Sequence, residues 1–312
     1  ETPSQPSEIS EPAPTWNPPE GLMQVPIWPD AAPDMAGVPH ADETVFDVKK
    51  SSNTNYVVIA NVTSPTMTIF PPKGNNTGAA IVVFPGGGYQ ILAMDVEGTE
   101  ICDWITANGI TCVLLKYRVP NSGCHWDKAK RKHVTPEIPN ALQDAQRTIS
   151  SIRYNASKYG IDSDKIGVMG FSAGGNLAVL SSTAFDKRSY DPIDEIDQVS
   201  NRPDFAIPVY PGHLTMEHKN KLPKAVAAQE LNTDIVISKH MPPTLLIHAI
   251  DDPVDPVHFS QVYERELKKS GVNVKLMLYQ NGGHAFGVRK QGKDTDTWPI
   301  DAINWLHEIK IL

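Results

Sequence analysis

Cysteines are scarce in this sequence, and no two of them are close together. Only Cys102, Cys112 and Cys124 occur in 312 residues, and there is no Cys-x-x-Cys motif. A zinc ribbon or a dithiol redox site is therefore not expected. Cys102 and Cys112 lie in apolar stretches, and because free cysteine is commonly buried, we expect both to be inert core residues. One disulfide, involving the loop residue Cys124, is the alternative.

Long apolar runs and an excess of positive charge are also absent. No stretch approaches the roughly 20 apolar residues of a membrane-spanning helix. The net charge of −8 argues against nucleic acid or an anionic membrane as a partner. Neither H-E-x-x-H nor the phosphate-binding G-x-x-x-x-G-K-[ST] occurs. We therefore expect neither a metal nor an organic cofactor.

The first 40 residues have few features of a folded segment. They hold 10 of the 27 prolines, and their opening, ETPSQPSEISEPAPTWNPPEG, is polar. Such a composition cannot bury enough surface to fold alone. We expect residues 1–40 to form a Pro-rich N-terminal arm and residues 41–312 to form one catalytic domain. The chain starts at Glu1 rather than Met, so a removed secretory signal, and a secreted or periplasmic protein, is expected.

Beyond this segment, short apolar runs alternate with segments of helical length. Continuous apolar runs are typical of strands buried on both faces of a parallel sheet. Alternation of strand and helix predicts right-handed βαβ units and an α/β fold, with a mostly parallel central sheet and helices on both faces. The expected strands are 57–63, 66–70, 79–84, 111–117, 165–170, 204–210, 243–250 and 273–279, and the expected helices include 98–109, 141–160, 258–271 and 300–312.

Three regions depart from this alternation. No helix separates the first expected strands, so we expect them to form an antiparallel edge. Residues 120–137 form a polar, basic insertion after one strand, and residues 211–240 lie between two strands. Because long loops at strand ends often carry substrate contacts, we expect residues 211–240 to form a small cap over the site.

The strongest motif is Gly170-Phe171-Ser172-Ala173-Gly174, which has the form G-x-S-x-G. It directly follows the expected strand KIGVMG and leads into the apolar helical run NLAVLSSTAF. A serine on such a sharp strand-to-helix turn is exposed as a nucleophile, and the small residues beside it let the chain segments pass closely. A glycine-rich packing turn is the alternative, but the strand–motif–helix context favours Ser172 as a nucleophile.

A serine nucleophile needs a general base, and an acid that orients this base. In this arrangement the chain order is serine, acid, histidine. His284 follows the expected strand NVKLMLY within Asn281-Gly-Gly-His-Ala-Phe-Gly287, where the glycines let the loop return over the sheet. We predict His284 as the base, with an exposed turn histidine as the alternative.

Three carboxylates compete for the role of the acid. Asp251, Asp252 and Asp255 follow the strand that precedes the one before His284. Asp251 fits a turn cap and Asp255 a helix N-terminal residue, which are both ordinary structural roles. Asp252 is the favoured acid, for the reason of similarity given below.

An oxyanion hole is indicated by Pro85-Gly86-Gly87-Gly88-Tyr89, which follows the expected strand AAIVVF. Consecutive glycines allow backbone N–H groups to converge on one oxygen. The loop lies two expected strands before the serine turn, where a helper loop is found in such folds. We predict Gly87, Gly88 and the N–H of Ala173 as the donors.

Taken together, these residues resemble the α/β-hydrolase superfamily over roughly residues 65–312. Within it, the chain is similar to the acetyl xylan esterase-like branch, near hormone-sensitive-lipase-like and dienelactone-hydrolase-like esterases. The resemblance implies the α/β-hydrolase fold and Asp252 as the acid, four residues before Pro256. The chain has Pro85 where lipase-like relatives have His, and Asp255 where an aliphatic residue is usual. The stretches that carry the similarity are FPGGGYQ, LLKYRVP, ALQDAQR, GFSAGGNLA, HAIDDPVDPVHFS and GGHAFG.

The expected function is that of a serine carboxylesterase with a Ser172–His284–Asp252 triad. The resemblance implies short-chain, acetyl esters as substrates, either small molecules or carbohydrates such as xylan. A serine peptidase or thioesterase with the same triad remains an alternative, as does a non-catalytic binding protein on this scaffold.

Overall fold

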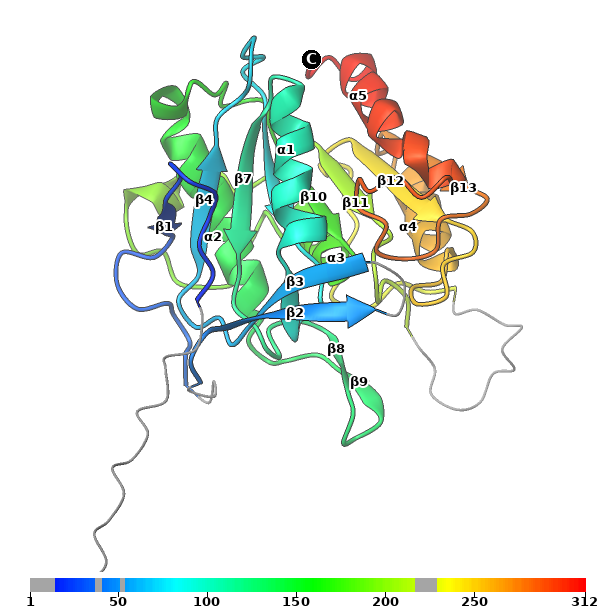
Figure 1. The fold of residues 1–312 in the computed structure, drawn as a ribbon, viewed down its shortest axis with the longest axis horizontal. Coiled ribbons are helices and arrows are strands. Elements are labelled where there is room, and N and C mark those ends of the chain that lie inside the picture. The colour runs from blue at the N-terminus through cyan, green and yellow to red at the C-terminus, as the bar shows by residue number, and fades with distance from the viewer. Residues whose placement is uncertain (1–14, 37–40, 51–53, 217–228) are drawn as a thin grey trace, which may run out of the picture.

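A single large sheet organises the molecule in the computed structural model, which describes residues 15–36, 41–50, 54–216 and 229–312. Its strand order is β1-β4-β7-β5-β10-β11-β12-β13 (Figure 1). From β7 to β13 neighbouring strands are parallel, whereas β4 pairs antiparallel with both β7 and β1. The prediction of a mostly parallel sheet is confirmed. The bounds are β1 Gln24–Pro26, β4 Thr66–Phe70, β5 Ala80–Phe84, β7 Thr111–Lys116, β10 Ile166–Phe171, β11 Ala206–Val209, β12 Thr244–Ala249 and β13 Val274–Tyr279.

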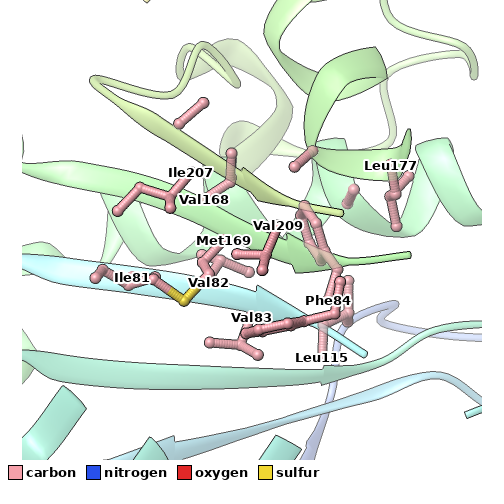
Figure 2. Packing of buried hydrophobic residues seen from close by; sticks show 14 of the residues in the cluster. Ile81, Val82, Val83, Phe84, Leu115, Val168, Met169, Leu177, Ile207 and Val209 are labelled. Atoms are coloured by element: carbon pink, nitrogen blue, oxygen red, sulfur yellow. The ribbon is translucent and has the colours of Figure 1, made fainter. Parts of the chain in front are cut away.

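The core lies along the central strands. Every residue of β5, β7, β10, β11 and β12 is buried, which explains why these segments read as unbroken apolar runs. Side chains such as Val83, Met169 and Val209 pack against one another across neighbouring strands (Figure 2). This packing fixes the strand ends, which is where the loops of the site begin.

Helices cover both faces of the sheet, as predicted. The helices α1 and α5 lie on one face, and α2 and α3 on the other, while α4 packs on β12 and β13 (Figure 1). The bounds are α1 Glu100–Ala107, α2 Asn140–Tyr154, α3 Ala173–Thr183, α4 His258–Lys269 and α5 Trp298–Glu308. Short helical turns are η1 Asp95–Thr99, η2 Ala156–Tyr159, η3 Glu195–Gln198 and η4 Asp294–Thr297.

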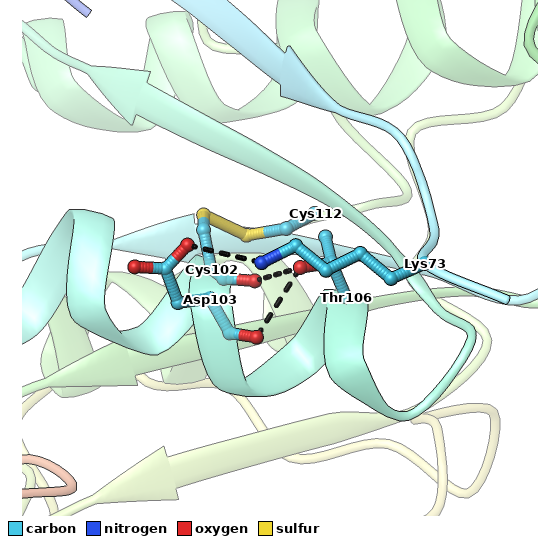
Figure 3. Close-up of a disulfide and its surroundings, with 5 residues drawn as sticks. All are labelled: Lys73, Cys102, Asp103, Thr106 and Cys112. Atoms are coloured by element: carbon cyan, nitrogen blue, oxygen red, sulfur yellow. Dashed lines mark hydrogen bonds and ion pairs between the residues drawn. A yellow bond between two sulfur atoms is a disulfide. The ribbon is translucent and has the colours of Figure 1, made fainter. Parts of the chain in front are cut away.

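The expectation of inert core cysteines at Cys102 and Cys112 is wrong for both. Cys102 on α1 and Cys112 on β7 are fully buried, but they form a disulfide (Figure 3). Cys124, the residue considered as a disulfide partner, is free and buried. The chain turns back at Gly109, so that β7 runs alongside α1. Two cysteines ten residues apart in sequence therefore meet. Local composition alone does not reveal this geometry.

A second, three-stranded sheet lies beside the C-terminal ends of the main strands (Figure 1). It consists of β2 Thr44–Lys50, β3 Thr54–Ala60 and β6 Ile91–Ala93, all antiparallel. The expected strand 57–63 therefore corresponds to β3 and does not join the edge of the main sheet. The expected antiparallel edge is formed by β4 and β1 instead.

The prediction of a separate arm over residues 1–40 is wrong for the described part, residues 15–36. Residues 24–26 form the edge strand β1, and Trp16, Ile27 and Trp28 are buried in the main core. Residues 1–14 and 37–40 of the predicted arm lie outside the described residues. This Pro-rich segment packs on the core because three of its residues supply apolar surface to bury: Trp16, Ile27 and Trp28.

The N-terminal segment is held by a group of mostly buried ions that we call the arginine cluster. Its members are Arg118, Arg147, Asp144, Asp194 and Asp197. Arg118 Nη2 lies 2.9 Å from Asp144 Oδ1, and the same oxygen accepts a hydrogen bond from the Trp28 indole. Both guanidinium groups lie within 6 Å of the Trp28 ring centroid, at 5.9 and 5.6 Å.

Of the two long loops expected from the sequence, the structure describes the first throughout and the second only in part. The insertion 120–137 carries a small hairpin of β8 His125–Asp127 and β9 Lys132–Val134. Residues 217–228 of the predicted cap 211–240 lie outside the described residues, and its described flanks are joined by an isolated bridge between Thr215 and Leu231. Within the described residues, no helix is both long and apolar enough to cross a bilayer.

Candidate active site

Ser172 occupies a strained turn between β10 and α3. Its backbone has φ 55° and ψ −116°, which a non-glycine residue rarely adopts. A Cβ atom on Gly170 would overlap the carbonyl of Gly174, and one on Gly174 would overlap the carbonyl of Phe84. The glycines of the motif are therefore required by close backbone contact. The turn leaves Ser172 Oγ facing a cavity at the C-terminal ends of the strands.

His284 faces Ser172 from the loop between β13 and α5. Its Nε2 lies 3.0 Å from Ser172 Oγ, and the ring packs on Tyr210 with 4.8 Å between centroids. The loop bends through Gly282 and Gly283, both with positive φ, and a Cβ on Gly282 would overlap Thr295. The glycines thus return the imidazole over the strand ends.

Asp252 lies on the opposite side of the imidazole from Ser172. Its Oδ2 is 2.8 Å from His284 Nδ1, and its Oδ1 accepts hydrogen bonds from the N–H groups of Val254 and Asp255 at 2.9 Å each. Burial alone would raise the pKa of the Asp252 carboxyl, but the His248 and His284 rings and the backbone donor at Val254 hold this pKa well below its usual range. The carboxylate therefore stays charged, and it can orient the imidazole.

The other two carboxylates that competed for this role have different positions. Asp251 accepts a hydrogen bond from the N–H of Gly283 at 2.8 Å, so it ties the acid loop to the histidine loop. Asp255 does not occupy a helix N-terminus, because α4 begins at His258. Its Oδ2 accepts a hydrogen bond from Ser172 Oγ at 3.1 Å instead. The structural role considered for Asp255 is therefore wrong.

The pKa of the His284 imidazole reflects several opposing influences. Burial alone would lower it, whereas the hydrogen bond to Asp252 and the charges of Asp255, Asp252 and Glu97 raise it. The net effect raises the pKa above the ordinary histidine value. The surrounding carboxylates thus favour the protonated ring, which is the state a general base reaches after it accepts a proton.

The loop after β5 brings Gly87 and Gly88 to the cavity that Ser172 and His284 line. The carbonyl of Gly87 accepts hydrogen bonds from the N–H groups of Gln90 and Ile91, which closes the turn, and Gly87 and Gly88 both have positive φ. Ala173 is the first residue of α3, directly after Ser172, so its N–H belongs to the helix N-terminus. Of the three predicted donor residues, Gly87 and Gly88 line the cavity, and Ala173 follows Ser172 directly in the chain.

Glu97 is a buried acid that the sequence did not single out. Its Oε2 accepts a hydrogen bond from the N–H of Gly86 at 2.8 Å, and its Oε1 accepts one from the Tyr210 hydroxyl at 2.9 Å. Burial raises the pKa of the Glu97 carboxyl. The side chain connects the glycine loop to Tyr210, whose ring supports His284. Its position in a five-residue helical turn gave no periodic signal from which this contact was predictable.

The cavity has a volume of about 310 Å³ and mostly apolar walls. Its lining includes Val48 and Tyr56 of β2 and β3, together with Ile91 of β6 and Val96 of η1. Among the described residues, the second sheet rather than the predicted cap segment 211–240 therefore covers this cavity. The described residues His213, Thr215, Met216 and Asn232 line a different hollow of about 190 Å³. No group of three or more His, Cys, Asp or Glu side chains in the described part of the chain is arranged to hold a metal ion.

A mostly parallel sheet of this order, with serine, acid and histidine following β10, β12 and β13, defines an α/β-hydrolase. Sequence comparison agrees with this class. The model of the prolyl oligopeptidase family matches residues 139–309, more than half of the chain, and the chain belongs to that family. The BD-FAE family model matches residues 67–210.

Individual relatives carry esterase or xylanase names. The acetylxylan esterase of Xylanibacter ruminicola is 30% identical over 260 residues, which are 78% of this chain and 48% of that protein. The endo-1,4-beta-xylanase B of Butyrivibrio fibrisolvens is 26% identical over 67% of this chain and 32% of its own length. This chain thus spans about half or less of these curated relatives.

Among solved structures, an acetyl ester-xyloside bifunctional hydrolase from Caldicellulosiruptor lactoaceticus is similar, with a TM-score of 0.68 and 26% identity. The similarity covers 93% of this chain and 97% of that one. The similarity therefore extends over nearly the whole of both chains, which share the same architecture.

Proposed function

We propose that this protein is a serine carboxylesterase that hydrolyses acetyl and other short-chain esters, including those on carbohydrates such as xylan. The observation that carries the proposal is the chain of contacts from Asp252 through His284 to Ser172, at 2.8 and 3.0 Å. Such a chain activates a hydroxyl that is otherwise a weak nucleophile at neutral pH.

In the proposed acylation step, Ser172 Oγ attacks the ester carbonyl and its proton passes to His284 Nε2. Asp252 accepts the hydrogen bond of His284 Nδ1–H and so stabilises the imidazolium. The carbonyl oxygen, now negatively charged, accepts hydrogen bonds from the N–H groups of Gly87, Gly88 and Ala173. Collapse of this intermediate expels the alcohol, which takes the proton from His284, and leaves an acyl group on Ser172.

In the proposed deacylation step, water takes the place of the alcohol. His284 accepts a proton from the water as its oxygen attacks the acyl carbon, and the same donors hold the oxyanion. The C–O bond to Ser172 then breaks, Ser172 regains the proton, and the acid leaves. The cycle needs only groups of the chain and water.

Two observations support a small ester as the substrate. A volume of about 310 Å³ is near the lower end of the range for ligand cavities. The names of the Xylanibacter ruminicola relative and of the Caldicellulosiruptor lactoaceticus structure both refer to acetyl esters. A cavity of this size would take a short acyl group, with a larger alcohol extending outward.

A serine peptidase is the second candidate, and the specific reason is the match to the prolyl oligopeptidase family. Fold and family do not determine the bond that is cleaved, since one triad serves both ester and amide hydrolysis. The relatives with esterase names favour the ester.

The test compares three substrate classes with one purified enzyme: acetylated xylo-oligosaccharides, p-nitrophenyl acetate and peptidyl p-nitroanilides. We expect acetate release from the first two and little cleavage of the third, with all activity lost in Ser172→Ala. Preferential cleavage of the anilides would replace the esterase proposal with the peptidase one. Hydrolysis of p-nitrophenyl acetate without action on acetylated sugars would retain the esterase but reject the carbohydrate substrate.

We further propose that the enzyme acts outside the cytoplasm. The Cys102–Cys112 disulfide supports this proposal, because structural disulfides persist mainly in oxidising compartments. Thiol labelling and mass spectrometry of the protein isolated from its source, from the medium and from the cell interior, would test this. A protein found only in the cytoplasm with both thiols reduced would contradict it.

A further inference from the structure

A second carboxylate faces the reacting atoms of the site. Asp255 Oδ2 lies 3.1 Å from Ser172 Oγ and 3.7 Å from His284 Nε2. Asp252 contacts the same imidazole only from the other side, at Nδ1. The two carboxylates therefore bracket the ring, and the one at Nε2 is beside the proton that moves during the reaction.

The Asp255 side chain is held in this position by its own loop. Its N–H donates to Asp252 Oδ1 at 2.9 Å, and its carbonyl oxygen lies 2.8 Å from His248 Nε2. The side chain is 6% exposed. The loop that supplies the triad acid thus also fixes Asp255, with little freedom to turn away.

Gly212 leaves the space that the Asp255 carboxylate occupies. A Cβ atom at position 212 would lie 2.9 Å from Asp255 Oδ2, and the N–H of Gly212 donates to the carbonyl of Ser172 at 3.1 Å. The backbone around the nucleophile is therefore shaped to accommodate a carboxylate at this point.

We propose that Asp255 is a second catalytic carboxylate, which accepts the hydrogen bond of the Ser172 hydroxyl in the free enzyme and pairs with His284 once the ring is protonated. The proposal rests on the roles given to Ser172 and His284 under the proposed function. It adds a group that contacts the reacting oxygen itself, on the side of the ring where the triad acid does not reach.

The proton balance of the step is unchanged by Asp255. The Oγ–C bond forms, the hydroxyl proton passes to His284 Nε2, and the carbonyl electron pair moves to its oxygen. Asp255 takes up no proton and remains a carboxylate. Before the transfer it holds the Ser172 O–H in competition with His284, and after the transfer it stabilises the cation at Nε2–H. It thereby strengthens the base and raises the pH at which this base becomes protonated.

Several charged or titratable groups face His284 from the elements around it. Asp252 and Asp255 come from the loop after β12, Glu97 from η1 and Tyr210 from the end of β11. His248 on β12 lies behind Asp252, with 3.4 Å between Nε2 and Oδ2. Among these groups, Asp255 has a carboxylate oxygen beside Nε2. Its removal should therefore change the protonation of the ring without breaking the contact between Asp252 and Nδ1.

The experiment measures the rate at which an alkyl fluorophosphonate modifies Ser172, as a function of pH. The Oγ–P bond forms, fluoride leaves and His284 takes the hydroxyl proton, so the reaction reports on the base whatever the natural ester. Wild type is compared with Asp255→Asn and Asp255→Val, two neutral side chains of different shape. Asp103→Asn on the exposed face of α1 is the matched control for the loss of one negative charge.

In both Asp255 variants we expect the acidic limb of the rate profile to lie about one pH unit below that of the wild type. The plateau rate should fall about threefold to tenfold, because a less basic ring accepts the proton less readily. The limb and the plateau of Asp103→Asn should match those of the wild type.

Coincident limbs in wild type and both Asp255 variants would overturn the proposal, as would a limb that moves to higher pH. Failure of both variants to fold, judged by circular dichroism, would assign Asp255 a structural role and would also overturn it. If the fluorophosphonate reacts but no ester is cleaved, only the proposed ester function fails. If it does not react with the wild type at all, the assigned nucleophile is wrong and the inference about Asp255 falls with it.

Discussion

Two regions of this molecule each place three carboxylates beside a cation, and the kind of cation differs between them. In the arginine cluster, Asp144, Asp194 and Asp197 face Arg118 and Arg147. At the strand ends, Glu97, Asp252 and Asp255 surround His284, and we call these three the site acids. Guanidinium stays charged at all ordinary pH values, whereas imidazole changes its charge near neutrality.

The difference in the cation separates a structural task from a chemical one. The hydrogen bond from Arg147 lowers the pKa of Asp194, so this pair remains ionised and joins α2 to η3. The site acids act on a ring that must lose and regain a proton. Burial of carboxylates alone therefore does not mark a catalytic site, because the neighbouring base decides what the charge does.

The largest expected effect concerns the nucleophile that the site acids serve. Ser172→Ala should lower kcat by about 10⁴–10⁶, as in other triad deletions, while the fold is retained. Steady-state hydrolysis of p-nitrophenyl acetate measures the loss, and thermal unfolding by circular dichroism provides the control. A loss of less than tenfold in a folded protein would show that the site acids surround a different nucleophile.

A pair of isosteric substitutions at the active site distinguishes the triad acid from its neighbour. Asp252→Asn should lower kcat by about 10⁴ because the ring loses its orienting charge, with a smaller effect on stability. Asp251→Asn should cost much less, since Asp251 only holds the N–H of Gly283. If Asp251→Asn or Asp255→Asn lowers kcat far more than Asp252→Asn, another carboxylate is the triad acid.

The matching change in the arginine cluster should affect stability rather than chemistry. Asp144→Asn leaves Arg118, which is 2% exposed, without its charged partner. We expect a loss of about 3–5 kcal/mol in the free energy of unfolding, with kcat of the folded enzyme within about twofold of the wild type. Urea unfolding and enzyme assays on the same preparations measure both. A tenfold loss of kcat at unchanged stability would contradict the division between the two regions.

The pH profile of activity separates the two regions, because an imidazole titrates near neutrality and a guanidinium does not. His284 acts as a base in its neutral form, and its pKa is raised above the ordinary histidine value. Activity should therefore be present above this raised pKa and be lost as the pH falls through it. The midpoint of kcat/KM against pH should lie above that of a free imidazole. A flat profile across this interval would argue against a histidine base.

The smallest expected effects concern the acyl group. We expect kcat/KM to fall severalfold from acetyl through butyryl to octanoyl p-nitrophenyl esters, because a cavity of about 310 Å³ has limited room for added carbons. A long apolar pocket would show the reverse trend, with about 0.8 kcal/mol gained for each buried CH₂. An optimum at octanoyl would exclude the short-chain proposal, but it would leave the assignments of Ser172 and His284 intact.

The features predicted from sequence are those with a local signal. The strands β5, β7 and β10 are continuous apolar runs, and Ser172 and His284 are embedded in glycine patterns that few other structures require. The choice of Asp252 over its neighbours depended on similarity, since three carboxylates within five residues have equivalent local signals.

The features missed are those that depend on contacts between distant segments. Trp28 lies in a segment with the composition of a linker, and its burial depends on Arg118 and Arg147, more than 80 residues later. The Cys102–Cys112 pair forms because β7 turns back alongside α1. Glu97 and Asp255 are polar residues in short turns, and their importance follows only from the side chains that the fold places beside them.

The short strand β1 also has a consequence for how the protein meets other proteins. It covers the outer backbone of β4, whose sequence TMTIF is apolar and β-branched. Unpaired strands of this kind recruit strands from other chains, whereas β1 is three residues long and ends at Pro26, which has no N–H to offer. A chain shortened to begin at residue 41 would expose β4 as the margin of the sheet. We therefore expect β1 to prevent β4 from pairing with strands of other chains, in addition to the packing of its segment on the core.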